Sequence, residues 1–129
     1  MAVNLTGTWT NSNGKDRDIV EIISIPGGIF IHNHNNKPGQ DFENEGIAKL
    51  PSGTCYANIG DKFNVIWSDT SNSKGQEKGI RHCTTLILVS MNLLEQVADQ
   101  ILTPGITKSK HKTSYGNWRR STNQGTDVL

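Results

Sequence analysis

A Gly-x-Trp near the start of the chain is matched by a Trp-Arg pair near its end, and both lie in runs typical of β-strands. Gly7 and Trp9 stand in the first of these runs, and Trp118 and Arg119 stand in the last. Short strand-like runs and polar turns fill the sequence between them. A sheet whose first and last strands pair with each other has no exposed edge, and it encloses a cup that can hold one small ligand. The pattern therefore predicts an all-β closed sheet.

The composition agrees with one small barrel. The chain has 129 residues, of which 33% are hydrophobic and 13 are glycine, and its formal net charge is +1. We expect a single domain over residues 1–129 with many turns and a partly polar interior. The near-neutral charge gives no reason to expect a nucleic-acid partner, and the lack of any long apolar run gives no reason to expect a membrane partner.

The two cysteines and the first residues add little. Cys55 and Cys83 form no Cys-x-x-Cys motif and no zinc-ligand spacing, so two free thiols are expected, with a disulfide left open if the protein is exported. The first residues have no charged segment followed by an apolar one, so no signal peptide is expected in this sequence.

Turn residues divide the first half of the chain. Strands are expected over 5–11, 17–25 and 29–33, with polar turns at 11–16 and at the Pro-Gly-Gly of 26–28. Residues 34–41 read as a loop. Residues 45–50 and 52–59 leave two alternatives: both are strands, or only the second belongs to the main sheet.

Alternation defines two later strands. Phe63, Val65 and Trp67 share one face of the run 62–67, and the run 81–90 has one face with Thr84 and Leu86 and another with Cys83 and Ile87. A long polar loop is expected over 69–79. Residues 92–102 have apolar residues at helical spacing and a potential capping box, so local propensity favours a helix there. Alternate up-and-down strand order instead requires a strand.

Five fragments, in the right order, resemble the avidin/streptavidin family. They are residues 5–11 (LTGTWTN), 63–67 (FNVIW), 82–86 (HCTTL), 98–105 (ADQILTPG) and 117–122 (NWRRST). The resemblance implies an antiparallel eight-stranded up-and-down β-barrel of calycin type, with a strand at 93–103. It also implies biotin as the ligand, with no other cofactor, a homodimer or homotetramer, and a secreted or periplasmic location.

The resemblance also assigns a ligand-binding site. Biotin has an uncharged ureido head, an apolar bicyclic body and a tail ending in a carboxylate, so its site needs buried polar groups and aromatic walls. By resemblance, Asn11 donates to the ureido oxygen and Asp127 accepts from a ureido N–H. Thr84 lies by the ring sulfur, and Trp67 forms a wall. Trp118 covers the pocket of a neighbouring subunit, and Asn35 lies near the mouth.

Several positions depart from the family pattern. Lys15 stands in place of a serine, Asn33 in place of a tyrosine, and His82 in place of a second serine. Leu86 and Ile101 replace two aromatic walls. The spacing from Trp118 to the acidic residue is one longer than in the family, which leaves Asp127 and Thr126 as alternatives for one position. These departures predict reduced affinity for biotin.

Other functions are weighed on the same residues. A calycin barrel for another small hydrophobic ligand is one alternative, and a glycan-binding or protein-interaction barrel that uses the loops 34–41 and 69–79 is another. No acid–base pair stands out, so an enzyme is not expected. His32 and His34 share a strand face, but no third metal ligand is evident. Trp9 is expected to be structural, packed beside a basic residue of the last strand.

Overall fold

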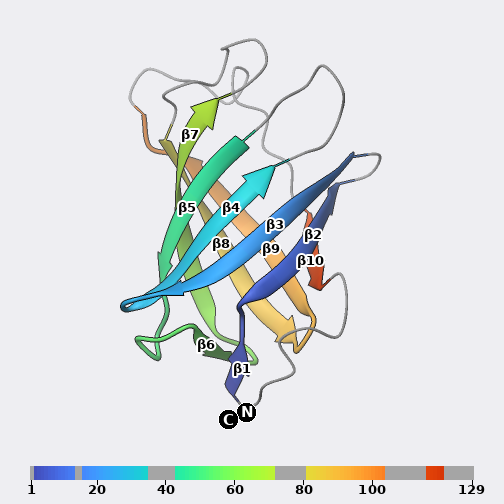
Figure 1. Ribbon diagram of the computed structural model, residues 1–129, viewed down its shortest axis with the longest axis vertical. Helices are drawn as coiled ribbons and strands as arrows, with labels where there is room; N and C mark the ends of the chain where they lie inside the picture. The colour runs from blue at the N-terminus through green and yellow to red at the C-terminus, as the bar shows by residue number, and fades with distance from the viewer. Residues whose placement is uncertain (1, 14–15, 35–42, 72–80, 104–115, 121–129) are drawn as a thin grey trace.

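Eight antiparallel strands form a closed barrel in up-and-down order. The structure is a computed structural model, and it describes residues 2–13, 16–34, 43–71, 81–103 and 116–120. Neighbours around the barrel follow the order β10-β2-β3-β4-β5-β7-β8-β9 (Figure 1). The strand bounds are β2 Gly7–Asn13, β3 Asp16–Ile25, β4 Gly28–His34, β5 Glu43–Lys49, β7 Lys62–Ser71, β8 Arg81–Ser90, β9 Leu93–Ile101 and β10 Asn117–Arg120. The predicted fold class is confirmed, and no helix of the described chain is long and apolar enough to cross a membrane.

Alternating side chains divide the barrel wall into an inner and an outer face. Phe63, Val65 and Trp67 of β7 are buried, and so are Thr84 and Leu86 of β8, as the alternation predicts. The intervening outward residues of β7 are exposed or half-buried. The period of two therefore separated the two faces of both strands, and for β8 the resemblance indicated which face is inward.

The β3–β4 hairpin reverses on two residues. Ile25 pairs with Gly28, so only Pro26 and Gly27 form the turn. Gly27 has a φ of 86°, which a proline-glycine type II turn requires and which side chains other than glycine rarely adopt. The turn expected over 11–16 is shorter than predicted, because β2 continues to Asn13 and β3 begins at Asp16.

The two regions that the sequence left ambiguous, 45–59 and 92–102, each contribute one strand to the barrel. Residues 93–101 form β9, so the strand implied by the resemblance is correct and the helical spacing does not determine the structure. Of the two candidate strands around Pro51, the first is β5 of the barrel. The alternative in which only the second belongs to the main sheet is wrong, because 52–59 contributes only the short strand β6 (Tyr56–Asn58).

One end of the barrel is closed by a small sheet and by a stacked pair of side chains. Strand β1 (Ala2–Asn4) pairs with β6 outside the barrel order, at the lower end in Figure 1. Inside that end, the Arg120 guanidinium lies 4.2 Å from the centre of the Trp9 ring. Trp9 is fully buried, and its Nε1 donates to the carbonyl of Leu5 at 3.0 Å. The structural role expected for Trp9 is thus confirmed.

Candidate functional site

Inward-facing polar side chains gather at the other end of the barrel. Strands β2 and β4 end, and β8 begins, at the end of the barrel opposite β1 and β6 (Figure 1). Apart from Arg120, the buried polar residues of the described chain lie on these three strands, towards that end. The buried polar set there is Asn11, Asn33, His82 and Thr84. Side chains of this kind are mostly exposed in proteins, so their burial at one end marks a candidate binding site.

Hydrogen bonds connect four side chains along one wall of this site. Trp67 Nε1 donates to Thr84 Oγ1 at 2.8 Å, and Thr84 Oγ1 donates to Asp99 Oδ1 at 2.8 Å. His82 Nδ1 lies 3.1 Å from the same Asp99 oxygen, and the His82 ring stacks on Trp67 with centroids 6.0 Å apart. These hydrogen bonds hold the Trp67 ring in a fixed position. They also provide partners for the Asp99 carboxylate, whose side chain is only 2% exposed.

Asp99 is the residue of this site that the sequence analysis missed. Leu94 faces inward, and strict alternation from it would turn Asp99 outward. A bulge in the pairing of β8 with β9 shifts the alternation, so that Asp99 stands opposite Thr84 and Ile101 opposite His82. A bulge has no reliable pattern in a single sequence. The sequence of β9 did not single out Asp99 either, because the same strand also carries Glu95, Gln96 and Gln100.

The charge of Asp99 also reaches the neighbouring thiol. Burial raises the pKa of Cys83, and the Asp99 carboxylate raises it further. Both described cysteines, Cys55 and Cys83, are free thiols, as expected. A raised pKa reduces the thiolate fraction at neutral pH, so Cys83 is not an activated nucleophile.

Three buried polar atoms around the site have no hydrogen-bond partner in the described part of the chain. They are Asn11 Oδ1, Asn33 Oδ1 and Trp118 Nε1. Each such atom costs about 1–3 kcal/mol when it is removed from water without a partner. Two acceptors and one donor are therefore available to a group that enters the barrel.

Trp118 occupies its own barrel. The resemblance places this side chain over the pocket of a neighbouring subunit, which would leave it exposed on a single chain. Trp118 is instead 1% exposed, with its ring centroid 6.0 Å from that of Trp67. The register of β10, which sets Trp118 opposite the inward-facing Asn11, explains this orientation. The assumption of an exposed Trp118 is wrong for the chain as described.

The remaining predicted residues fall in three places. Leu86 is fully buried and lies deeper in the core, opposite Phe63. Ile101 is half-buried on the site side of β9. Lys15, Asn35, Thr126 and Asp127 lie outside the described residues.

A small residue makes room for the Trp67 wall. A Cβ atom on Gly46 of β5 would lie 2.8 Å from Trp67 Cε3 and 2.5 Å from Val65 Cγ1. Glycine at this position lets the backbone of β5 approach the ring directly.

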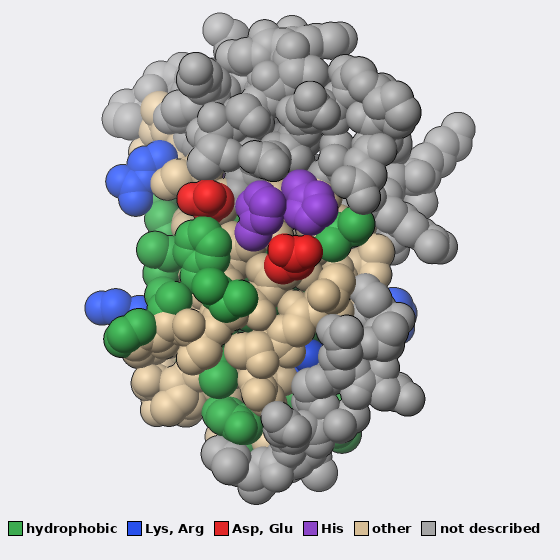
Figure 2. All heavy atoms as spheres, viewed as in Figure 1, with side chains coloured by type: hydrophobic (Ala, Val, Ile, Leu, Met, Phe, Trp, Pro, Cys, Tyr) green, Lys and Arg blue, Asp and Glu red, His purple; other side chains and the backbone are tan. Residues whose placement is uncertain are grey.

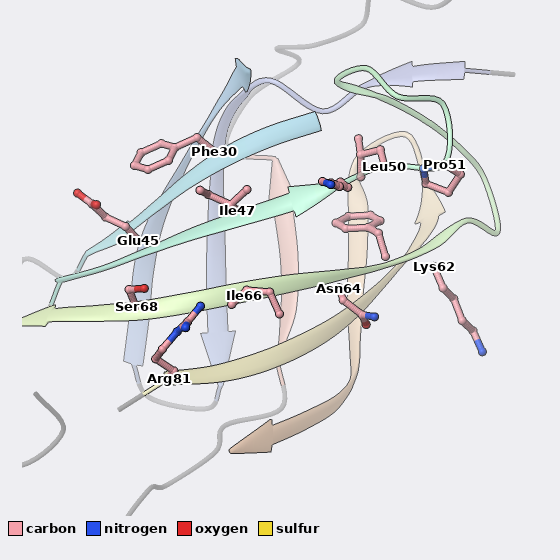
Figure 3. A pocket seen from close by; sticks show the side chains of 12 residues that line it. Phe30, Glu45, Ile47, Leu50, Pro51, Lys62, Asn64, Ile66, Ser68 and Arg81 are labelled. Carbon is pink, nitrogen blue, oxygen red and sulfur yellow. The ribbon is translucent and has the colours of Figure 1, made fainter. Parts of the chain in front are cut away.

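A separate groove of about 770 Å³ lies on the outer surface of the barrel (Figure 3). Phe30, Ile47 and Ile66 supply apolar area there, and Lys62 and Arg81 are among the charged lining residues. These side chains alternate with inward-facing ones, so the sheet separates the groove from the polar residues inside.

Searches of protein-family models, curated proteins and solved structures return no match to this chain. The fold and the site together define a closed, antiparallel eight-stranded barrel with a polar, aromatic-walled interior at one end. The function of the chain is therefore argued from this geometry.

Proposed function

We propose that the barrel is a small-molecule binding protein that takes biotin, or a ligand with the same cyclic urea group, into the polar end of its interior. The observation that carries the proposal is a set of three buried polar atoms without a partner in the described part of the chain, one of them on the Trp118 ring that lies against Trp67. Binding sites for small ligands combine apolar walls with a few polar groups of this kind.

The urea group of biotin is complementary to these atoms. It offers one carbonyl oxygen, which matches the N–H of Trp118, and two N–H groups, which match the side-chain oxygens of Asn11 and Asn33. In this arrangement Asn11 accepts a hydrogen bond, whereas the resemblance has it donate one. The Trp67 and Trp118 rings, tilted by 59° to each other, present apolar area to the bicyclic body. Pairing three buried atoms that are otherwise unpaired gives the ligand both affinity and orientation.

The other expectations belong to the same proposal. The protein acts as a binder and not as an enzyme, in a secreted or periplasmic location. Association into a dimer or tetramer now rests on exposed apolar side chains of the outer face, such as Val89 and Ile47, which are 41% and 50% exposed, and not on Trp118. Light scattering on the purified chain measures that state.

The test is a calorimetric titration with biotin. We expect saturable binding of one biotin per chain, together with a change in tryptophan fluorescence, since Trp67 and Trp118 line the site. Asn11→Ala and Asn33→Ala should each weaken binding by about tenfold, which corresponds to the loss of one buried hydrogen bond. Asn64→Ala is the matched control, because Asn64 is exposed on the outer face.

No heat and no thermal shift up to millimolar biotin would refute the proposal. The same result would move the search to other small hydrophobic ligands, and then to glycans. Binding that the Asn64 variant weakens as much as the Asn11 and Asn33 variants would also contradict it, because the ligand would then lie outside the barrel.

A further inference from the structure

Two histidines and a glutamate meet on the outer face of the β3–β4 hairpin. Glu21 of β3 stands directly opposite His32 of β4, and His34 is two residues further along the same face of β4. Figure 2 shows the two histidine side chains next to each other on the surface, with acidic side chains beside them. None of the three residues belongs to the site inside the barrel.

The distances bring one potential ligand atom from each residue together. The His32 and His34 rings are stacked with centroids 5.0 Å apart, and His34 Nε2 lies 3.9 Å from Glu21 Oε1. The three potential ligand atoms all lie within 4.8 Å of one another. Ligands of a tetrahedral ion at about 2.0–2.2 Å are themselves about 3.4 Å apart, so small side-chain rotations suffice to close the site.

The strand geometry limits how far the ligands can separate. His32 and His34 are fixed on one face by the period of two, and Glu21 is held opposite His32 by the β3–β4 pairing. The side chains of Glu21 and His34 are 55% and 22% exposed, so an ion can reach them and water can fill its remaining positions.

We propose that Glu21, His32 and His34 form a binding site for a divalent transition-metal ion such as Zn²⁺. Two imidazoles and one carboxylate are ligands that suit Zn²⁺, Cu²⁺ and Ni²⁺, whereas Mg²⁺ and Ca²⁺ prefer oxygen ligands alone. The opposite neighbour of His32 on β5 is Glu45, an exposed carboxylate that adds negative charge on the other side of the imidazole. The sequence analysis identified the two histidines, and the pairing of β3 with β4 brings Glu21 to them as the third ligand.

The test is titration of the untagged protein, residues 1–129, with Zn²⁺ by calorimetry. We expect one Zn²⁺ per chain, and at least tenfold weaker binding in His32→Ala, His34→Ala and Glu21→Gln. Glu95→Gln is the matched control for the glutamate, because Glu95 is an exposed carboxylate on β9. It should bind Zn²⁺ as the unmodified protein does.

Two further measurements keep the result unambiguous. Circular dichroism and thermal unfolding should show that the variants remain folded, since all three residues are on the surface. Addition of Cu²⁺ should give an electron paramagnetic resonance spectrum with nitrogen coupling, which the double variant His32→Ala/His34→Ala loses. No saturable binding at millimolar Zn²⁺, or binding that the double variant retains, would overturn the proposal.

Discussion

Arg120 is the residue that connects the closed end of the barrel. Its guanidinium donates to the carbonyls of Met91 at 3.0 Å, of Thr6 at 3.1 Å and of Asn4, while it stacks on Trp9. Burial lowers the pKa of Arg120 from its usual range, but the group stays charged. One side chain therefore satisfies carbonyl groups from two segments, around residues 4–6 and at Met91, that are distant in sequence.

Replacing the Arg120 side chain tests whether its hydrogen bonds stabilise the closed end of the barrel. Arg120→Met should lower the free energy of unfolding by about 3 kcal/mol, because it leaves the three carbonyls without their donor. Denaturant unfolding measures the change.

The adjacent residue provides the control for this substitution. Arg119→Met lies next in the chain and is exposed, so its effect should stay within about 0.5 kcal/mol. Equal losses in the two variants would show that the contacts of Arg120 contribute nothing specific.

At the scale of the elements, two glycines are needed for different reasons. Gly27 turns the β3–β4 hairpin at a positive φ with open space around it, whereas Gly46 lies in a strand against the Trp67 ring. The first position constrains the backbone and the second constrains the packing.

An alanine substitution at each glycine should separate the effect on the backbone from the effect on the packing. Gly27→Ala should cost about 1 kcal/mol through its backbone conformation and leave the tryptophan fluorescence unchanged. Gly46→Ala should cost about 1–3 kcal/mol and shift the fluorescence, because the new methyl group displaces Trp67. Thermal unfolding and emission spectra are the measurements, and a spectral shift in the Gly27 variant would contradict this explanation.

The strands themselves were largely predictable, and the details that position the site were not. Alternation identified the inner face of 62–67 and separated the two faces of 81–90, and the Pro-Gly turn identified the β3–β4 hairpin. Strand β9 needed the resemblance, because its local sequence favours a helix and only pairing with β8 and β10 makes it a strand. Strand β1 was not expected, since three residues carry too little pattern.

The candidate site was predicted only in part, because alternation within a strand is visible in the sequence and pairing between strands is not. Asn11, Trp67, His82 and Thr84 are inward and near one end, as side-chain alternation on long strands allows. Asp99 depends on a bulge and Trp118 on the register of β10, and both are set by pairing between distant segments. Pairing of this kind is a property of the whole sheet and leaves no local signature.

Closure of the barrel depends on the strand with the fewest described residues. Strand β10 has four residues in the described part of the chain, whereas the other barrel strands have seven to ten. It pairs with β2 on one side and β9 on the other, and it contributes both Trp118 and Arg120 to the interior. Without it, β2 and β9 would each present an unpaired edge.

A shortened chain tests this dependence. A protein that ends at Gly116 lacks β10 and should self-associate through the two free edges, which light scattering detects as high-mass species. A protein that ends at Arg120 keeps β10 and is the control. A monodisperse, fully folded chain ending at Gly116 would show that closure does not require this strand.

Strand β4 has a further consequence, because its two faces carry residues of both proposed sites. Asn33 points into the barrel between His32 and His34, which point out, so a single backbone separates the two sites. Coupling between two binding sites is reciprocal. If an ion on the outer face changes the affinity for the interior ligand by some factor, the ligand changes the affinity for the ion by the same factor. Where the two sites are coupled, a coloured ion such as Co²⁺, held by the histidines, would report optically on what enters the barrel.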